Sequence, residues 1–204
     1  MIELEQEGGL WTVTLARPDK ANSLTGEMLE RLVEIAESAG EARALILTGR
    51  GKVFSAGADL DEAKAGLAVS PLWERLSGAL ARLPALKIAA LNGTLAGGAN
   101  GMALACDLRI AVPGAKIFYP VMKLGYLPQP SDPARMTALI GPARTKLILM
   151  GGQRIPAEEA YTFGLIDRIV PPEDLMETAR RLCADTLAAP AEVANGIAGM
   201  CSRD

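Results

Sequence analysis

The chain has 204 residues, of which 50% are hydrophobic and 22% charged, enough for one substantial core but too few for two typical domains. Its net charge of −3 arises from 21 basic and 24 acidic residues scattered along the sequence, so no basic stripe is available for a nucleic acid. The sequence has three cysteines and no histidine, and no CxxC pair occurs. Neither a zinc site nor a disulfide framework is therefore expected.

The first nine residues are acidic and lack the basic and apolar regions of an export signal. No apolar run approaches the roughly 20 residues that a membrane-spanning helix needs. We therefore expect a soluble cytoplasmic chain without nucleic-acid or membrane partners. It should form one domain over residues 1–188, followed by a short tail at 189–204.

The chain opens with two segments, 2–7 and 10–15, in which apolar and polar residues alternate around a glycine pair. This pattern predicts a β-hairpin. Apolar residues then recur at helical spacing between Thr25, which suits an N-cap, and Gly40, which suits a helix stop. An amphipathic helix is expected there.

Strands and helices are predicted to alternate through the middle of the chain. Apolar runs at 44–48 and 87–91 predict buried strands, and leucines at helical spacing along 73–83 predict the helix between them. Further strands are expected at 108–112 and 116–119, and further helices at 133–140 and 143–150. The pattern predicts an α/β fold with a mainly parallel sheet, whose ligands usually bind at the carboxyl ends of strands.

Two glycine-containing turns follow predicted strands. The first, Ser55 to Asp59, consists of small residues, so a backbone N–H near Ala56 can point outward. The second, Gly97 to Ala99, leads into a helical run, so Gly98 can present an unpaired N–H at a helix start. Two such amides would form an oxyanion hole for an acyl oxygen. Tight structural connections remain the alternative, whereas neither turn matches a phosphate-binding GxGxxG or GxxxxGK motif.

Three motifs, in this order and spacing, resemble the crotonase (enoyl-CoA hydratase/isomerase) superfamily. They are Arg17 to Leu24 (RPDKANSL), Phe54 to Leu60 (FSAGADL), and Asn92-Gly93 with Gly97-Gly98. The similarity extends over about residues 2–185. The resemblance implies a spiral of ββα units and a homotrimer or hexamer. It also implies an acyl-CoA substrate that carries coenzyme A itself, without a permanently bound cofactor.

The resemblance further implies which residues meet this ligand. The amides of Ala56 and Gly98 would hold the thioester oxygen. The candidate coenzyme A segment consists of Lys20, Ala56, Ala58, Asp59 and Leu60. Within it, Asp59 is expected to cap or brace the turn, and Lys20 either meets a phosphate of coenzyme A or is a solvated surface lysine.

The sequence departs from the family pattern at the positions whose side chains usually transfer protons. The two glutamates usual in hydratases are replaced by Gly101 and Val121, and a third position used by several members is Gln129. None of these side chains is an ordinary general acid or base. Ordinary two-glutamate hydration is therefore not expected.

Asp132 is the remaining candidate catalytic acid or base, because it lies in a loop that lines the acyl pocket in the family. It also directly precedes Pro133 and a helical run, and we favour this N-cap role. Tyr119 and Tyr126 flank the same loop, where they either donate a hydrogen bond to a reacting group or only pack.

Two functions stay open. The first is a crotonase-type lyase or isomerase that stabilises an enolate, and decarboxylation suits it because this reaction needs an oxyanion hole more than a base. The second is a non-catalytic acyl-CoA binder or partner subunit. Compared with the family, which usually continues into further helices, a reduced C-terminal helical region is expected here. Pro190, Gly196 and Gly199 break the helical pattern of the segment Asp185 to Asp204, which predicts a frayed tail.

Overall fold

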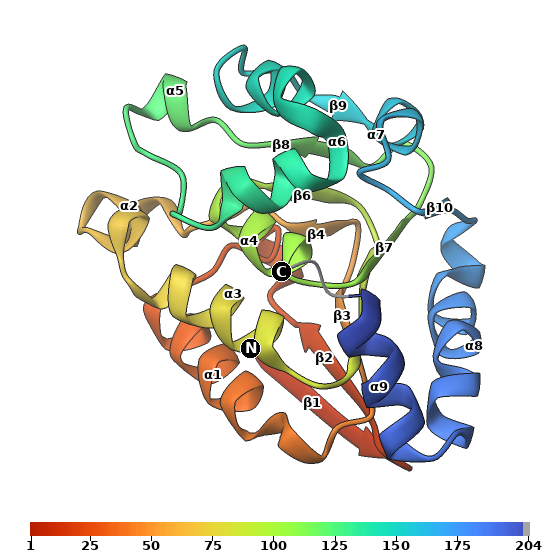
Figure 1. Ribbon diagram of the computed structural model, residues 1–204. Helices are drawn as coiled ribbons and strands as arrows, with labels where there is room; N and C mark the ends of the chain where they lie inside the picture. Colours follow the sequence, from red (N-terminus) through yellow and green to blue (C-terminus); the bar gives the residue numbers. More distant parts are fainter. Residues whose placement is uncertain (202–204) are drawn as a thin grey trace.

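The computed structural model describes residues 1–201, which form two sheets surrounded by helices (Figure 1). The larger sheet contains, in spatial order, β1 (Ile2–Glu7), β2 (Leu10–Leu15), β3 (Ala44–Gly49), β5 (Leu86–Leu91), β7 (Leu108–Ala111) and β10 (Arg168–Ile169). The smaller sheet contains β4 (Val53–Ser55), β6 (Thr94–Ala96), β8 (Lys116–Phe118) and β9 (Ile155–Pro156). Only the β1–β2 and β8–β9 pairs are antiparallel, so the predicted mainly parallel α/β fold is confirmed.

Strands are added to both sheets in the same order. Each successive pair of strands contributes one strand to the larger sheet and one to the smaller sheet; the pairs are β3 and β4, β5 and β6, and β7 and β8. In both sheets each new strand lies parallel to the strand from the preceding pair. The helices between and after them are α1 (Gly26–Ser38), α2 (Leu60–Lys64), α3 (Leu72–Arg82), α4 (Asn100–Leu104), α5 (Val121–Leu124), α6 (Asp132–Leu149), α7 (Ala157–Phe163), α8 (Leu175–Ala188) and α9 (Ala191–Cys201). The chain thus advances as the expected spiral of ββα units.

Local sequence signals explain the elements that were predicted. Thr25 is the N-cap of α1, and its hydroxyl accepts a hydrogen bond from the amide of Met28 at 3.2 Å. The helical stretches predicted at 133–140 and 143–150 form α6, which is broken at Gly141 because this residue has φ +77° and precedes Pro142.

Helices cover both sides of the larger sheet: Figure 1 shows α1 and α3 at the left and α8 and α9 at the right. Helix α8 packs on β3, β5 and β7. The Arg43 guanidinium binds the carboxyl end of α8, donating to the carbonyls of Thr186 at 2.6 Å and Leu187 at 3.0 Å. None of the helices in residues 1–201 is long and apolar enough to cross a bilayer.

The expectation of a frayed tail is wrong for residues 185–188, which complete α8, and for residues 191–201, which form α9. Pro190 directly precedes this helix, where its fixed φ and missing N–H are compatible with a helix start. The glycines at 196 and 199 are accommodated within the helix. Residues 202–204 of the predicted tail lie outside the described residues.

Candidate active site

The two glycine turns lie against each other at the carboxyl ends of the neighbouring parallel strands β4 and β6. A Cβ atom on Gly57 would lie 2.9 Å from the carbonyl oxygen of Ala96 and 3.2 Å from Cα of Gly97. Gly57 has φ +90° and Gly97 has φ +58°, values that favour glycine. The turns can approach this closely because Gly57 lacks a side chain, whereas a Cβ on Gly97 would lie at an ordinary contact distance, 3.5 Å from Cα of Gly57.

Gly57→Ala is expected to destabilise the fold by about 1–3 kcal/mol for the positive φ alone, and by more because the methyl group meets Ala96. Gly66→Ala is the matched control, since Gly66 has φ +111° and no atom within 4 Å of the added Cβ. Urea unfolding of both variants and the wild type measures the difference. Equal losses would show that contact between the turns adds nothing to stability.

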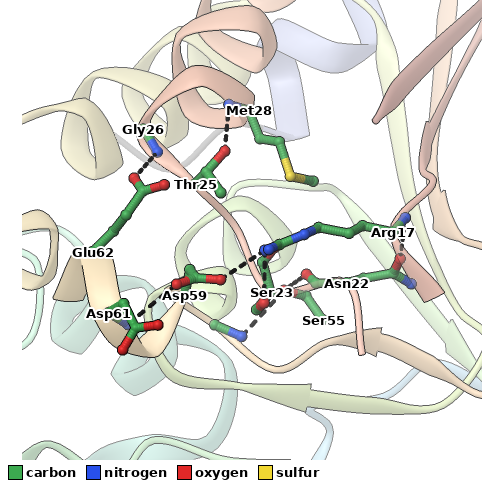
Figure 2. A network of polar contacts seen from close by, with 11 residues as sticks. Arg17, Asn22, Ser23, Thr25, Gly26, Met28, Ser55, Asp59, Asp61 and Glu62 are labelled. Carbon is green, nitrogen blue, oxygen red and sulfur yellow. Dashed lines mark hydrogen bonds and ion pairs between the residues drawn. The ribbon is translucent and has the colours of Figure 1, made fainter. Parts of the chain in front are cut away.

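The motif that begins at Arg17 braces the first turn (Figure 2). The Ser55 hydroxyl donates to the carbonyl of Asn22 at 2.8 Å and accepts from the Gly57 amide at 3.2 Å. The Arg17 guanidinium donates to Asp59 Oδ2 at 2.8 Å. Polar groups from two distant segments therefore fix the shape of the turn.

Asp59 caps helix α2 as well as pairing with Arg17. Its Oδ1 accepts a hydrogen bond from the Asp61 amide at 3.1 Å. The hydrogen bond from Arg17 holds the pKa of the Asp59 carboxyl below its usual range. The expected bracing role of Asp59 is confirmed.

The backbone amides of the first turn correct one prediction. The Ala56 N–H donates to the carbonyl of Ala21 at 3.0 Å, so Ala56 does not present the free donor expected of it. The amides of Gly57 and Asp59 are also hydrogen-bonded. Within residues 1–201, the Ala58 amide has no acceptor, which makes Ala58 the available donor of this turn.

The second turn places Gly98 in a short 3-10 helix, Gly97–Ala99, directly before α4. An amide at this position has no acceptor within the helix. The Trp73 ring lies against Gly98, because an added Cβ would be 3.0 Å from Cε3 of the ring. The indole N–H of Trp73 donates to the carbonyl of Leu67 at 2.8 Å, which fixes the ring over the turn. Gly98 as the second acyl-oxygen donor stays a prediction that this geometry permits.

Asp132 is fully buried beside α4, 0% exposed. Its Oδ2 accepts a hydrogen bond from the Tyr119 hydroxyl at 3.0 Å. Its Oδ1 has no hydrogen-bond partner in the described part of the chain and would lie 2.9 Å from a Cβ on Gly101. The carboxyl thus occupies space that a side chain at position 101 would otherwise fill, one helical turn beyond Gly98.

The favoured N-cap role of Asp132 is wrong. Ser131 holds the N-cap position of α6, and Asp132 is the first helical residue, with its carboxyl directed to Tyr119. The cap comes from α3, where the Glu74 carboxylate accepts the Ser131 amide at 3.2 Å on Oε2 and the Ser131 hydroxyl on Oε1. Because the Glu74 carboxylate from α3 binds the N-cap residue of α6, the Asp132 carboxyl does not cap this helix and can bind Tyr119 instead.

Burial raises the pKa of Asp132 to about 7, and the negative charge of Glu74 adds to this increase. The Tyr119 hydrogen bond and the positive charge of Arg135 act in the opposite direction. Burial also raises the pKa of the Tyr119 phenol well above its usual value, so this group stays protonated and donates to Asp132.

This raised pKa predicts a pH-dependent stability effect. Below about pH 4 the carboxyl is protonated in both the folded and unfolded states. As the pH rises to about 7, only the unfolded state loses the proton readily, so the folded state loses stability, by on the order of 4 kcal/mol in total. Asp132→Asn should therefore gain stability over the wild type at pH 8 but not at pH 4. An equal difference at both pH values in chemical unfolding would contradict the shift.

The remaining predicted residues differ in burial. Val121 is buried and Gln129 half-buried, and the amide of Gln129 donates to the Tyr119 hydroxyl at 3.5 Å. Lys20 and Leu60 are exposed, with Leu60 78% accessible. Tyr126 is also exposed, and the hydrogen bond to Asp132 comes from Tyr119 instead. Sequence patterns did not indicate Glu74 or Arg135, because each lies at an ordinary position of a helix.

Comparisons with known proteins identify the family of this chain. The family model for enoyl-CoA hydratase/isomerase matches residues 5–199. The chain is 35% identical over 190 residues to the short-chain-enoyl-CoA hydratase of Clostridium acetobutylicum, covering 89% of this chain and 73% of that protein. It is 34% identical over 188 residues to the 1,2-epoxyphenylacetyl-CoA isomerase of Escherichia coli K12, covering 86% and 72%.

Solved structures share the fold over almost the full length. An enoyl-CoA hydratase subunit from Geobacillus kaustophilus HTA426 superposes with a TM-score of 0.87 at 35% identity, covering 97% of this chain and 79% of that one. A Thermobifida fusca YX protein solved in complex with CoA gives 0.86 at 29% identity, covering 95% and 81%. By its family match, its relatives and its fold, the chain belongs to the enoyl-CoA hydratase/isomerase family of the crotonase superfamily.

Proposed function

We propose that this chain is an acyl-CoA isomerase that moves a carbon–carbon double bond through an enolate, with Asp132 as the proton-transferring group. The observation that carries the proposal concerns Oδ1 of Asp132, which is buried beside Gly101. No donor in residues 1–201 forms a hydrogen bond with this oxygen. A buried acceptor without a hydrogen-bond partner lowers the stability of the fold. A role in proton transfer to or from a substrate would explain why the protein keeps this carboxyl. Relatives named for enoyl-CoA and epoxyphenylacetyl-CoA chemistry support the substrate class.

In this proposal the amides of Ala58 and Gly98 bind the thioester oxygen. Both lie in turns that approach each other closely, and preorganised donors of this kind stabilise a developing oxyanion. Lys20 and Leu60 are exposed near the first turn, at positions suited to a phosphate and to the chain of coenzyme A. Coenzyme A is then part of the substrate and not a resident cofactor.

In this mechanism Asp132 carries one proton from C2 to C4 of the same substrate molecule. The Asp132 carboxylate takes a proton from C2 of a 3-enoyl thioester, and the electron pair of that C–H bond forms an enolate whose oxygen the two amides hold. The neutral Asp132 returns the proton to C4, so the double bond moves to C2 and C3 and no atom is gained or lost. A pKa of about 7 suits one group that both accepts and returns a proton. The Tyr119 hydroxyl keeps the carboxyl oriented.

The same observations favour isomerisation over the other reactions considered. Hydration must activate a water and protonate a carbon, tasks for which Gly101 and Val121 offer no groups. Decarboxylation needs no base, which would leave the buried carboxyl of Asp132 without a role. One carboxyl is sufficient for a proton shift between C2 and C4.

The test is incubation of the protein with 3-hexenoyl-CoA, crotonyl-CoA and malonyl-CoA. We expect 2-hexenoyl-CoA to form from the first, with no hydration of the second and no carbon dioxide from the third. Carbon dioxide release without isomerisation would indicate a lyase. Binding of all three by calorimetry without turnover would support the alternative, a non-catalytic acyl-CoA binder. Cytoplasmic location and a homotrimer or hexamer remain proposals, the latter to be measured by light scattering.

A further inference from the structure

Two successive residues of α3 contact the two halves of the candidate site. Trp73 packs on Gly98 in the second turn, as described above. Glu74 binds Ser131, 57 positions away in the sequence, through both oxygens of its carboxylate. Since Ser131 directly precedes Asp132, these bonds fix the backbone from which the Asp132 side chain extends.

Glu74 supplies what the start of α6 lacks. The first amides of a helix have no partners within it, and a carboxylate there is favoured by the helix dipole. The Ser131 side chain makes no capping bond of its own, and its hydroxyl donates to Glu74. The half-buried Glu74 therefore holds its charge at this helix end through two bonds.

Polar groups from three elements surround the Asp132 carboxyl. Tyr119 comes from the end of β8, Glu74 from α3, and Arg135 from one turn further along α6. The Arg135 Nη1 is buried without a hydrogen-bond partner within residues 1–201, and the positive charge of Arg135 acts on the Asp132 carboxyl. The fourth element packed here, α4, contributes Gly101 and carries no charged side chain.

We propose that Glu74 is a positioning residue for Asp132, which it holds in place through Ser131 while keeping a negative charge beside the reacting carboxyl. This inference rests on the proposed function, in which Asp132 transfers the proton. Glu74 has no contact with the thioester in this scheme. It determines where the Asp132 carboxyl lies and at which pH that carboxyl changes its protonation.

The test is Glu74→Gln, which keeps an oxygen acceptor for Ser131 and removes the charge. Loss of a nearby negative charge favours the ionised form of Asp132. In an NMR titration of the full chain, the chemical shift of the Asp132 carboxyl carbon should report a pKa lower than that of the wild type by on the order of one pH unit. The acid limb of the pH profile of kcat/KM should move in the same direction. Arg135→Gln should raise both the pKa of Asp132 and the pH of the acid limb, because it removes a positive charge near the carboxyl.

Glu62→Gln is the matched control. Glu62 accepts the Gly26 amide at 2.7 Å at the start of α1, so this variant alters a similar bond to another helix and should leave the Asp132 titration unchanged. If Glu74→Gln does not fold, Glu74→Asp keeps the charge on a shorter side chain and should give a titration near that of the wild type with a lower kcat.

An unchanged Asp132 titration in folded Glu74→Gln would overturn the inference, as would a wild-type kcat in Glu74→Asp. These outcomes are separate from failure of the proposed function. A wild-type protein that does not convert 3-hexenoyl-CoA would overturn the isomerase proposal, whereas the NMR titration would still measure the effect of Glu74 on Asp132.

Discussion

Asp132→Asn is expected to lower kcat on 3-hexenoyl-CoA by roughly two to four orders of magnitude, the usual contribution of a general acid–base group. Asparagine keeps the size of the side chain and an acceptor for the Tyr119 hydroxyl, but it cannot take a proton from C2. Asp61→Asn is the control, because the Asp61 side chain is 96% exposed. Calorimetry should show that the Asp132 variant still binds the acyl-CoA.

The wild-type pH profile gives a second readout of the same group. The base form of Asp132 is required to begin the reaction, so kcat/KM should fall as the pH decreases below about 7. A variant Asp132→Asn with wild-type turnover would remove this residue from the mechanism. An acid limb near the ordinary aspartate pKa would instead show that burial does not raise the pKa of the substrate-free carboxyl.

Gly98→Pro is expected to reduce kcat by about 10²- to 10³-fold more than Gly98→Ala does, the usual cost of one oxyanion-hole donor. Both substitutions add a Cβ atom that would lie 3.0 Å from the Trp73 ring. Only proline also removes the backbone N–H. Gly98→Ala measures the effect of the added Cβ atom, so the further loss of single-turnover rate in Gly98→Pro reports removal of the amide together with the ring that proline adds.

Two outcomes would contradict the role of this amide. Equal activity of the two variants would mean that the Gly98 N–H does not hold the acyl oxygen. A loss confined to KM would mean that the amide binds the ground state and the transition state equally well. Circular dichroism of both variants establishes that the comparison is made between folded proteins.

Sequence patterns predicted the long elements well, for identifiable reasons. The hairpin, α1 and α3 were found close to their predicted bounds because each repeats one period over several residues, and β3 and β5 because each is an apolar run with a clear end signal. Three strands of the smaller sheet, β4, β6 and β9, have only two or three residues each. A period cannot be recognised over so few residues, so the second sheet was not predicted from periodicity.

The two glycine turns were located correctly, but the donor within the first turn was not. Small residues at 55–59 predict that an amide can be exposed, yet every amide in the turn fits that description. The acceptor for Ala56 is the carbonyl of Ala21, 35 positions earlier, and only the folded chain brings them together. The available donor is thereby moved to Ala58.

By itself, the sequence determined the α/β class, the family, the place of the two turns and the absence of carboxylates at 101 and 121, because these depend on residue identity and order along the chain. Only the tertiary structure decided where the Asp132 carboxyl lies and what it contacts. From its position before Pro133 it suits a cap, but Glu74 from α3 takes that role and Gly101 leaves room for the carboxyl. Burial and hydrogen-bond partners belong to neighbours in space, and these neighbours come from distant parts of the chain.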